Sequence, residues 1–236
     1  MIFKKSSHTA ILVFAASGKK DAWRKGIKGG DVLFDTLTDQ TVALASKTGL
    51  PYFVHTEKQQ KGFDFGSRLS NSIQAVFEQG YDNVIAIGND TPHLKLSHFK
   101  QAIDNLEQGV ATIGPSQDGG FYLLGINKAT FLKVENKENK ESSFSKLPWK
   151  TSRLTNSLTD SFSNGLVLYK MLDKLIDLDA SVDLRAILDY SLSLNEIILQ
   201  LILLLVESDK SIASNSSVFY LIKDADVYYN KGSPCC

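Results

Sequence analysis

The residues of this chain best suited to chemistry are aspartates that follow apolar runs. Residues 83–88 form a short apolar run, and Asp90 comes just after it, in a segment where Pro92 must end any sheet ladder. Residues 110–114 form a second run, which leads into Asp118. In an open α/β sheet, ligands bind beside the carboxyl ends of the strands. We therefore expect Asp90 and Asp118 to face one cleft.

Asp90 is the first candidate for binding a divalent metal. Carboxylates at strand ends can hold Mg²⁺ or Mn²⁺, and such an ion neutralises a diphosphate as it becomes a leaving group. The alternative is that Asp90 only stabilises the turn before Pro92, because aspartate commonly makes such turns. The residues themselves leave both roles open.

Asp118 precedes two glycines, Gly119 and Gly120. An Asp-Gly pair between apolar strands is a hairpin signal by itself, so a purely structural role is one interpretation. Two adjacent glycines also allow a ligand to approach the backbone closely. This favours a substrate-facing or catalytic role for Asp118, with Gly119 and Gly120 in contact with the substrate.

A third acidic segment contains Asp177 and Asp179, ahead of a predicted helix at 181–190. On extended backbone, residues two apart point to the same side, so both carboxylates could face one metal. The alternative is that Asp179 or Ser181 caps the helix that follows.

These segments resemble those of a known family. Residues 88–94 read GNDTPHL, and residues 114–125 read GPSQDGGFYLLG. They resemble the glycine-x-aspartate-x-proline and GP-x-x-DGG signatures of the DUF2064 family, and the D-x-D at 177–179 matches a third. The resemblance runs from about residue 9 to about residue 190. Members of this family are uncharacterised transferases similar to GT-A glycosyltransferases and to nucleotidyltransferases.

The resemblance implies roles for particular residues. Asp90 and Asp179 would bind Mg²⁺ or Mn²⁺, and Asp118 would act on the substrate. Arg68 matches the arginine of the family's G-E-R element and could bind phosphate, although a structural ion pair is the alternative. Trp149 matches a tryptophan of the family and could stack on a base or a sugar, although core packing is the alternative.

The first loop, residues 17–30, departs from the family pattern. The family has P-x-x-G-x-x-K-T-R-L after its first strand, whereas residues 16–25 read ASGKKDAWRK. The cationic character is kept, so Arg24 and Lys25 are the best candidates for binding a phosphate. The alternative is a solvated basic loop.

Hydrophobic periodicity predicts the elements that carry these residues. Strands alternate with amphipathic helices, which is typical of βαβ units and a mostly parallel sheet. With the resemblance, we expect a three-layer α/β/α sandwich of the GT-A, Rossmann-like nucleotide-diphospho-sugar transferase type. The polar stretch 133–146 is predicted to be a mobile loop, with a lid as one interpretation. The strands are expected at 9–16, 52–56, 83–88, 110–114, 121–125, 166–172 and 175–179, and the helices at 31–47, 67–79, 97–107, 153–162, 181–190 and 194–206.

Bulk properties limit the class of protein. The 236 residues contain 26 basic and 26 acidic side chains, so the formal net charge is zero. This balance does not point to nucleic acid or an anionic membrane as a partner. The only two cysteines are Cys235 and Cys236, which form no disulfide framework or metal motif. We predict a cytoplasmic protein without a membrane span. We divide it into a transferase domain at 1–190 and an appendage at 191–236, a helix and a hairpin that could form a homodimer contact.

The expected function is that of a metal-dependent transferase using a nucleotide-activated donor. The favoured reaction is glycosyl transfer from a nucleotide-sugar to an unknown acceptor, with Mg²⁺ or Mn²⁺ as the cofactor. Nucleotidyl transfer on the same fold is the alternative chemistry. A catalytically silent nucleotide-binding or regulatory protein is the alternative class, and the altered first loop favours it.

Overall fold

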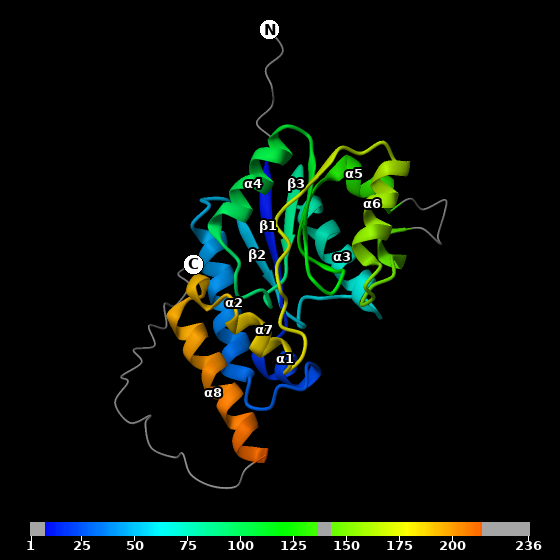
Figure 1. The fold of residues 1–236 in the computed structure, drawn as a ribbon. Coiled ribbons are helices and arrows are strands. Elements are labelled where there is room, and N and C mark those ends of the chain that lie inside the picture. The colour runs from blue at the N-terminus through cyan, green and yellow to red at the C-terminus, as the bar shows by residue number, and fades with distance from the viewer. Residues whose placement is uncertain (1–7, 136–142, 214–236) are drawn as a thin grey trace.

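A six-stranded sheet forms the centre of the molecule (Figure 1). The computed structural model describes residues 8–135 and 143–213. Strand β5 runs antiparallel to both of its neighbours, and the other pairings are parallel, which confirms the mostly parallel sheet. In spatial order the strands are β2 (Tyr52–His55), β1 (Thr9–Phe14), β3 (Asn83–Ile87), β5 (Phe121–Asn127), β4 (Ala111–Pro115) and β6 (Tyr169–Met171).

Helices cover both faces of this sheet, as the alternation of side chains along the strands requires. On β1, Ala10 and Leu12 join a buried cluster with α3 (Phe65–Glu78), α5 (Lys128–Val134) and α6 (Leu154–Asn164). The residues between and after them, Ile11 and Val13, join a second cluster on the other face, with α2 (Asp31–Ser46) and α4 (Leu96–Glu107). The two clusters confirm the three-layer sandwich.

Helix α3 shows how local sequence sets an element. Asp64 accepts a hydrogen bond from the Ser67 amide, and the Ser67 hydroxyl accepts one from the Asp64 amide. This capping box starts the helix at Phe65, two residues before the predicted start. Its apolar face is buried, and Gly80, at φ +95°, follows its end. The helix therefore holds Arg68 in its first turn, next to the sheet.

A third hydrophobic cluster lies beside α2 and joins segments that are distant in sequence. It contains residues of α2, of α7 (Asp183–Leu188) and of α8 (Glu196–Ala213), together with Ala22 and Ile27 from the first loop. Figure 1 shows α8 lying alongside α2 and α7. Within the described residues, no helix is long and apolar enough to cross a membrane. The division at residue 190 stays a prediction, and the predicted hairpin at 218–229 lies outside the described residues.

Four sequence predictions need correction. The first loop is not irregular throughout, because Gly18–Arg24 forms helix α1. The predicted strand at 166–172 shortens to β6, and residues 177–179 are not in a strand. The predicted loop at 133–146 begins inside α5 and ends in a 3-10 turn, Phe144–Lys146, whose Phe144 is buried. Residues 136–142, which the lid interpretation also needs, lie outside the described residues.

Candidate functional site

A cleft of about 410 Å³ opens where β1 and β3 end and where the β4–β5 hairpin turns back. Gly119 is the only predicted site residue that does not line it. The structure therefore brings together residues from six separate segments of the chain, and Asp90, Asp118 and Asp179 meet at one cleft as the strand-end argument expects. The predicted residues that line the cleft are Arg24, Lys25, Arg68, Asp90, Asp118, Gly120, Trp149 and Asp179.

Lys25 lies between two of these carboxylates. Its Nζ donates to Asp90 Oδ2 at 2.5 Å and to the Leu178 carbonyl oxygen at 2.6 Å, and it pairs with Asp179 Oδ1 at 3.1 Å. The Lys25 side chain is only 4% exposed, whereas those of Asp90 and Asp179 are 21% and 50% exposed. The two residues expected to bind a metal thus share one buried ammonium.

Lys25, Asp90 and Asp179 shift one another's pKa values. The pKa of Lys25 is raised and that of Asp90 is lowered. Burial by itself would lower the pKa of Lys25, but the charges of Asp90 and Asp179 outweigh it and raise the pKa above its ordinary value. Burial would raise the pKa of Asp90, but the charge and hydrogen bond of Lys25 hold it below its ordinary value. Burial, with repulsion from Asp90, raises the pKa of Asp179. Lys25 and Asp90 are therefore a charged pair at neutral pH.

Asp177 also lines the cleft and was named in the sequence only as the partner of Asp179. Thr91 Oγ1 donates to Asp177 Oδ1 at 2.6 Å. Burial, and then the charge of Asp90, raises the pKa of Asp177 well above its ordinary value. The D-x-D spacing in the sequence pointed to Asp177 as a site residue. Its burial beside Asp90 could be seen only in the tertiary structure.

The segment carrying Asp177 and Asp179 is held by backbone hydrogen bonds to β-strand ends. The Leu178 amide donates to the Asp90 carbonyl at 2.8 Å. The capping alternative for Asp179 and Ser181 is not observed, because the N-cap of α7 is Val182, without a side-chain cap. Instead, Asp183 accepts from the Asp179 and Ala180 amides. This leaves the Asp179 carboxylate free of capping and facing Lys25.

Asp118 stands in the hairpin turn between β4 and β5, as the structural interpretation predicts. Its Oδ1 accepts hydrogen bonds from the Gly120 amide at 2.9 Å and from the Ser116 hydroxyl at 2.5 Å. Within the described residues, its Oδ2 accepts no hydrogen bond. Asp118 therefore shapes the turn with one oxygen and leaves the other for a ligand in the cleft.

Gly119 has a packing role. Its φ is +91°, and a Cβ there would lie 2.1 Å from the Ser152 carbonyl oxygen. Its own carbonyl accepts from the Thr155 amide at 2.9 Å, at the start of α6. The glycine is therefore needed where the hairpin meets the segment before α6, and only its neighbour Gly120 lines the cleft.

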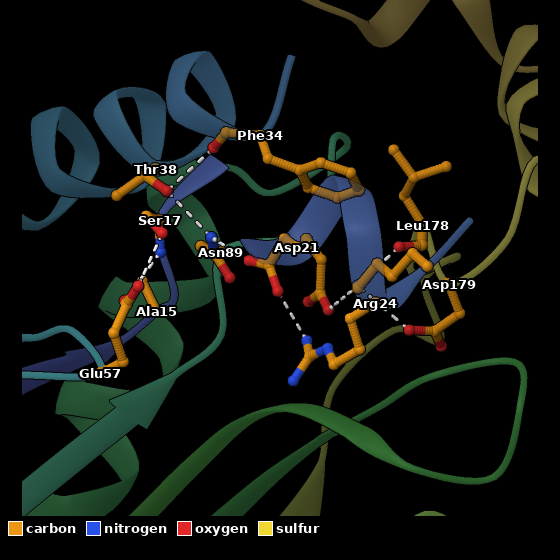
Figure 2. Close-up of polar contacts among 12 residues, drawn as sticks. Ala15, Ser17, Asp21, Arg24, Phe34, Thr38, Glu57, Asn89, Leu178 and Asp179 are labelled. Atoms are coloured by element: carbon orange, nitrogen blue, oxygen red, sulfur yellow. Dashed lines mark hydrogen bonds and ion pairs between the residues drawn. The ribbon is translucent and has the colours of Figure 1, made fainter. Parts of the chain in front are cut away.

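Arg24 belongs to a polar network that fixes α1 against α2 and β3 (Figure 2). Its Nη2 donates to Asp21 Oδ1 at 2.7 Å, and Asp21 Oδ2 accepts from Asn89 Nδ2 at 3.2 Å. Asn89 also donates to Thr38 Oγ1 at 2.9 Å. The Arg24 side chain is still 39% exposed, so it can reach a ligand without leaving Asp21.

The start of α1 is occupied by acidic side chains of the protein itself. Glu57 accepts hydrogen bonds from the Ser17 amide at 2.9 Å and from the Ser17 hydroxyl at 2.6 Å (Figure 2). Asp35 Oδ1 accepts from the Gly18 amide at 2.7 Å. Two backbone amides that a phosphate could use are therefore already bonded.

Trp149 is both a packing residue and part of the cleft wall. Its Nε1 donates to the Phe144 carbonyl at 3.1 Å, and its ring packs against Phe65, Phe121 and Phe144. Arg68 is half-buried on α3 and lines the same wall. Within the described residues, Arg68 forms no ion pair within 4.0 Å, so the structural alternative of such a pair is not observed there.

Whether these residues fit a divalent metal depends on Lys25. Carboxylate oxygens are the ligands that Mg²⁺ and Mn²⁺ prefer. However, Asp90 and Asp179 are both bonded to the Lys25 ammonium, which would repel a dication in the same place. In residues 8–135 and 143–213, no group of three or more His, Cys, Asp or Glu side chains could hold a metal ion. The arrangement does not fit a metal between Asp90 and Asp179.

Comparison with known proteins supports the fold. A family model described as "Uncharacterized protein conserved in bacteria (DUF2064)" matches residues 3–151. A Desulfovibrio desulfuricans protein, provisionally named a nucleotide-diphospho-sugar transferase, is 22% identical with a TM-score of 0.67, covering 88% of this chain and 97% of its own. This likeness confirms the GT-A-like nucleotide-diphospho-sugar transferase fold. No functionally curated protein matches the chain.

Two more distant structures have TM-scores below 0.5. A cytidylyltransferase from Leptospira borgpetersenii is 14% identical with a TM-score of 0.44, covering 91% of this chain and 100% of its own. A Mycobacterium tuberculosis protein, solved in complex with manganese, is 13% identical with a TM-score of 0.43, covering 78% of this chain and 99% of its own.

Proposed function

This chain belongs to the DUF2064 family, described only as uncharacterised bacterial proteins, and we propose that it is a transferase acting on a nucleotide-activated donor. The favoured donor is a nucleotide-sugar, and the binding site is the cleft at the ends of β1 and β3. The observation that carries this proposal is the cleft itself. Four cationic residues, Arg24, Lys25, Arg68 and Lys150, line it together with Asp118, at the strand ends where α/β folds bind ligands.

Side chains supply the phosphate contacts in this proposal. Arg24 and Arg68 line the cleft and keep guanidinium groups that can bind a diphosphate through paired hydrogen bonds. The backbone amides of Ser17 and Gly18 are bonded to Glu57 and Asp35, so they do not contribute. Lys25 offsets the negative charge of Asp90 and Asp179 from its buried position.

In this proposal, aromatic side chains on one wall of the cleft contact the base or the sugar of the donor. Phe65, Phe121 and Trp149 line the cleft next to Gly120, where no side chain limits close approach. An aromatic face there can pack against a base or a sugar ring. Because Trp149 also bonds to the Phe144 carbonyl, its ring is held in one orientation and needs little ordering on binding.

Asp118 is proposed to act on the acceptor. Its Oδ1 accepts hydrogen bonds from Ser116 and Gly120, which holds the carboxylate in one orientation at the cleft wall. A carboxylate held in this way can take the proton of an acceptor hydroxyl as the hydroxyl oxygen bonds to the sugar and the bond between the sugar and the departing nucleoside diphosphate breaks. The expected role of Asp90 and Asp179 as ligands of Mg²⁺ or Mn²⁺ is not part of this proposal, because both carboxylates are paired with Lys25.

A silent nucleotide-binding protein is the second candidate. The observation that favours it is the start of α1, where Glu57 and Asp35 occupy amides that could otherwise bind a phosphate. In that case the cleft would bind a nucleotide but transfer nothing.

A thermal-shift screen tests both candidates. The full chain is heated with nucleotides and nucleotide-sugars, in Mn²⁺ and separately in a chelator. A ligand present at about one hundred times its dissociation constant stabilises the folded state by about 2.7 kcal/mol. If no donor raised the melting temperature, the proposal would be contradicted.

The selected donor is then given to wild type and Asp118→Asn, and its breakdown is followed. Asparagine keeps an oxygen for Gly120 and Ser116, so the hairpin should be retained. A transferase should lose roughly a hundredfold or more in rate while still binding the donor. Equal rates in both proteins would remove Asp118 from catalysis, and no turnover in wild type would favour the silent binder.

A further inference from the structure

The surroundings of Lys25 resemble those of a bound cation. An ammonium has three N–H donors. Three oxygens lie within 3.1 Å of Lys25 Nζ, on Asp90, Leu178 and Asp179. Two of these belong to the carboxylates that were expected to bind a metal. Every donor of the ammonium is therefore satisfied within the protein.

Several contacts hold Lys25 in this position. Its amide donates to the Asp21 carbonyl at the end of α1, and its Nζ lies 5.3 Å from the centre of the Phe34 ring on α2. Leu178, whose carbonyl accepts from Nζ, is tied back to Asp90 through its own amide. The lysine and both acidic segments therefore form one connected unit, and moving the ammonium out would leave buried charge unpaired.

We propose that the Lys25 ammonium takes the place of a divalent cation between Asp90 and Asp179, so that ligands bind in this cleft without a metal. A dication at this position would face the ammonium at close range and would require it to leave its three acceptors. The part of this inference that concerns ligands rests on the proposed function, whereas the part that concerns the metal does not.

Titration of the full chain with Mn²⁺ alone, followed by electron paramagnetic resonance, tests the metal part. Wild type should show no saturable binding at Asp90. Lys25→Met keeps much of the side-chain length and removes the charge, so the freed carboxylates should bind Mn²⁺ at least about tenfold more tightly. Adding Asp90→Asn to Lys25→Met should abolish that gain. Arg24→Met is the matched control, because it removes a positive charge from the same cleft without freeing these carboxylates.

Saturable Mn²⁺ binding by wild type that Asp90→Asn removes would overturn the inference. A folded Lys25→Met that gains no affinity would also overturn it, since the carboxylates would then not form a cation position. If Lys25→Met does not fold, the wild-type titration decides alone.

The ligand part is read from the donor selected by the thermal-shift screen. Its affinity for wild type should be the same in Mn²⁺ and in chelator, and a strict need for Mn²⁺ would overturn the inference. Absence of any donor binding would count against the proposed function only, because the Mn²⁺ titration contains no nucleotide.

Discussion

Thr91 Oγ1 donates a 2.6 Å hydrogen bond to Asp177 Oδ1 across 86 residues of sequence. Asp177 lies beside Asp90, and its pKa is raised by burial and by the charge of that neighbour. Asp177 therefore keeps its proton to a higher pH than an ordinary aspartate does, whereas the pKa of its neighbour Asp90 is lowered. This relationship gives the cleft a group whose charge depends on pH.

Asp177→Asn should stabilise the protein at pH values above the folded pKa of Asp177. Because the folded pKa of Asp177 is raised, the free energy of unfolding of wild type falls as the pH rises from the ordinary aspartate pKa toward the folded one. Asparagine cannot ionise and still offers an oxygen to Thr91. The variant should therefore be more stable by roughly 1 kcal/mol above the folded pKa. Urea unfolding at a series of pH values measures this, with exposed Asp104→Asn on α4 as the control. Parallel pH profiles for Asp177→Asn and wild type would contradict the prediction.

Asp90→Asn should destabilise the fold by about 2 kcal/mol, because it leaves the buried Lys25 ammonium without its closest anion. Asp179→Asn is the matched control and should cost about 1 kcal/mol or less, because its side chain is 50% exposed. Chemical denaturation compares the two, and equal small losses would return Asp90 to the role of a turn residue.

The pH dependence gives a second check on Asp90. The pKa of Asp90 in the folded protein lies below its ordinary value. Its contribution to the free energy of unfolding is therefore fully present above the ordinary pKa, and it is lost as the pH falls through the folded pKa. The stability difference between wild type and Asp90→Asn should therefore shrink in acid. A difference that grows in acid would show that another group dominates.

Gly119→Ala should destabilise the protein more than Gly109→Ala does. Both glycines have positive φ, +91° and +75°, so both substitutions carry a backbone cost of about 1 kcal/mol. Only at Gly119 would the new Cβ meet other atoms, 2.1 Å from the Ser152 carbonyl oxygen, whereas nothing lies within 4 Å at Gly109. We expect an additional loss of roughly 2 kcal/mol at Gly119. Equal melting temperatures of the two variants would contradict the close packing between the hairpin and Ser152.

Arg68→Ala should weaken donor binding about tenfold, since a charged hydrogen bond to phosphate contributes roughly 1.5 kcal/mol or more. Its folding should change little, because Arg68 forms no ion pair within the described residues. Arg185→Ala, on the exposed side of α7, is the control and should bind as wild type does. Calorimetric titration measures both. Unchanged affinity of Arg68→Ala would remove this residue from the phosphate site.

Local sequence was enough to predict most of the framework. Buried strands such as β3 are continuous apolar runs, and α3 has an apolar stripe, a capping Asp64 and a terminal Gly80. These signals depend on neighbours a few residues apart, so they can be read without the fold. The placing of Asp90 and Asp118 at strand ends follows from the same signals. The position of β5 between β3 and β4, antiparallel to both, was not predicted, because strand order depends on pairing between distant segments.

The partners of the site residues were decided only by the tertiary structure. Lys25 was predicted as a phosphate ligand in a loop, but α1 packs through Ala22 into the cluster beside α2 and points the lysine at Asp90, 65 residues away. Glu57 and Asp35 likewise reach the start of α1 from other elements. A sequence pattern records which side chains can ionise. The partner of a buried charged side chain depends on how distant loops pack together in the fold. The strength of such an ion pair comes from the burial of both groups rather than from their spacing along the chain.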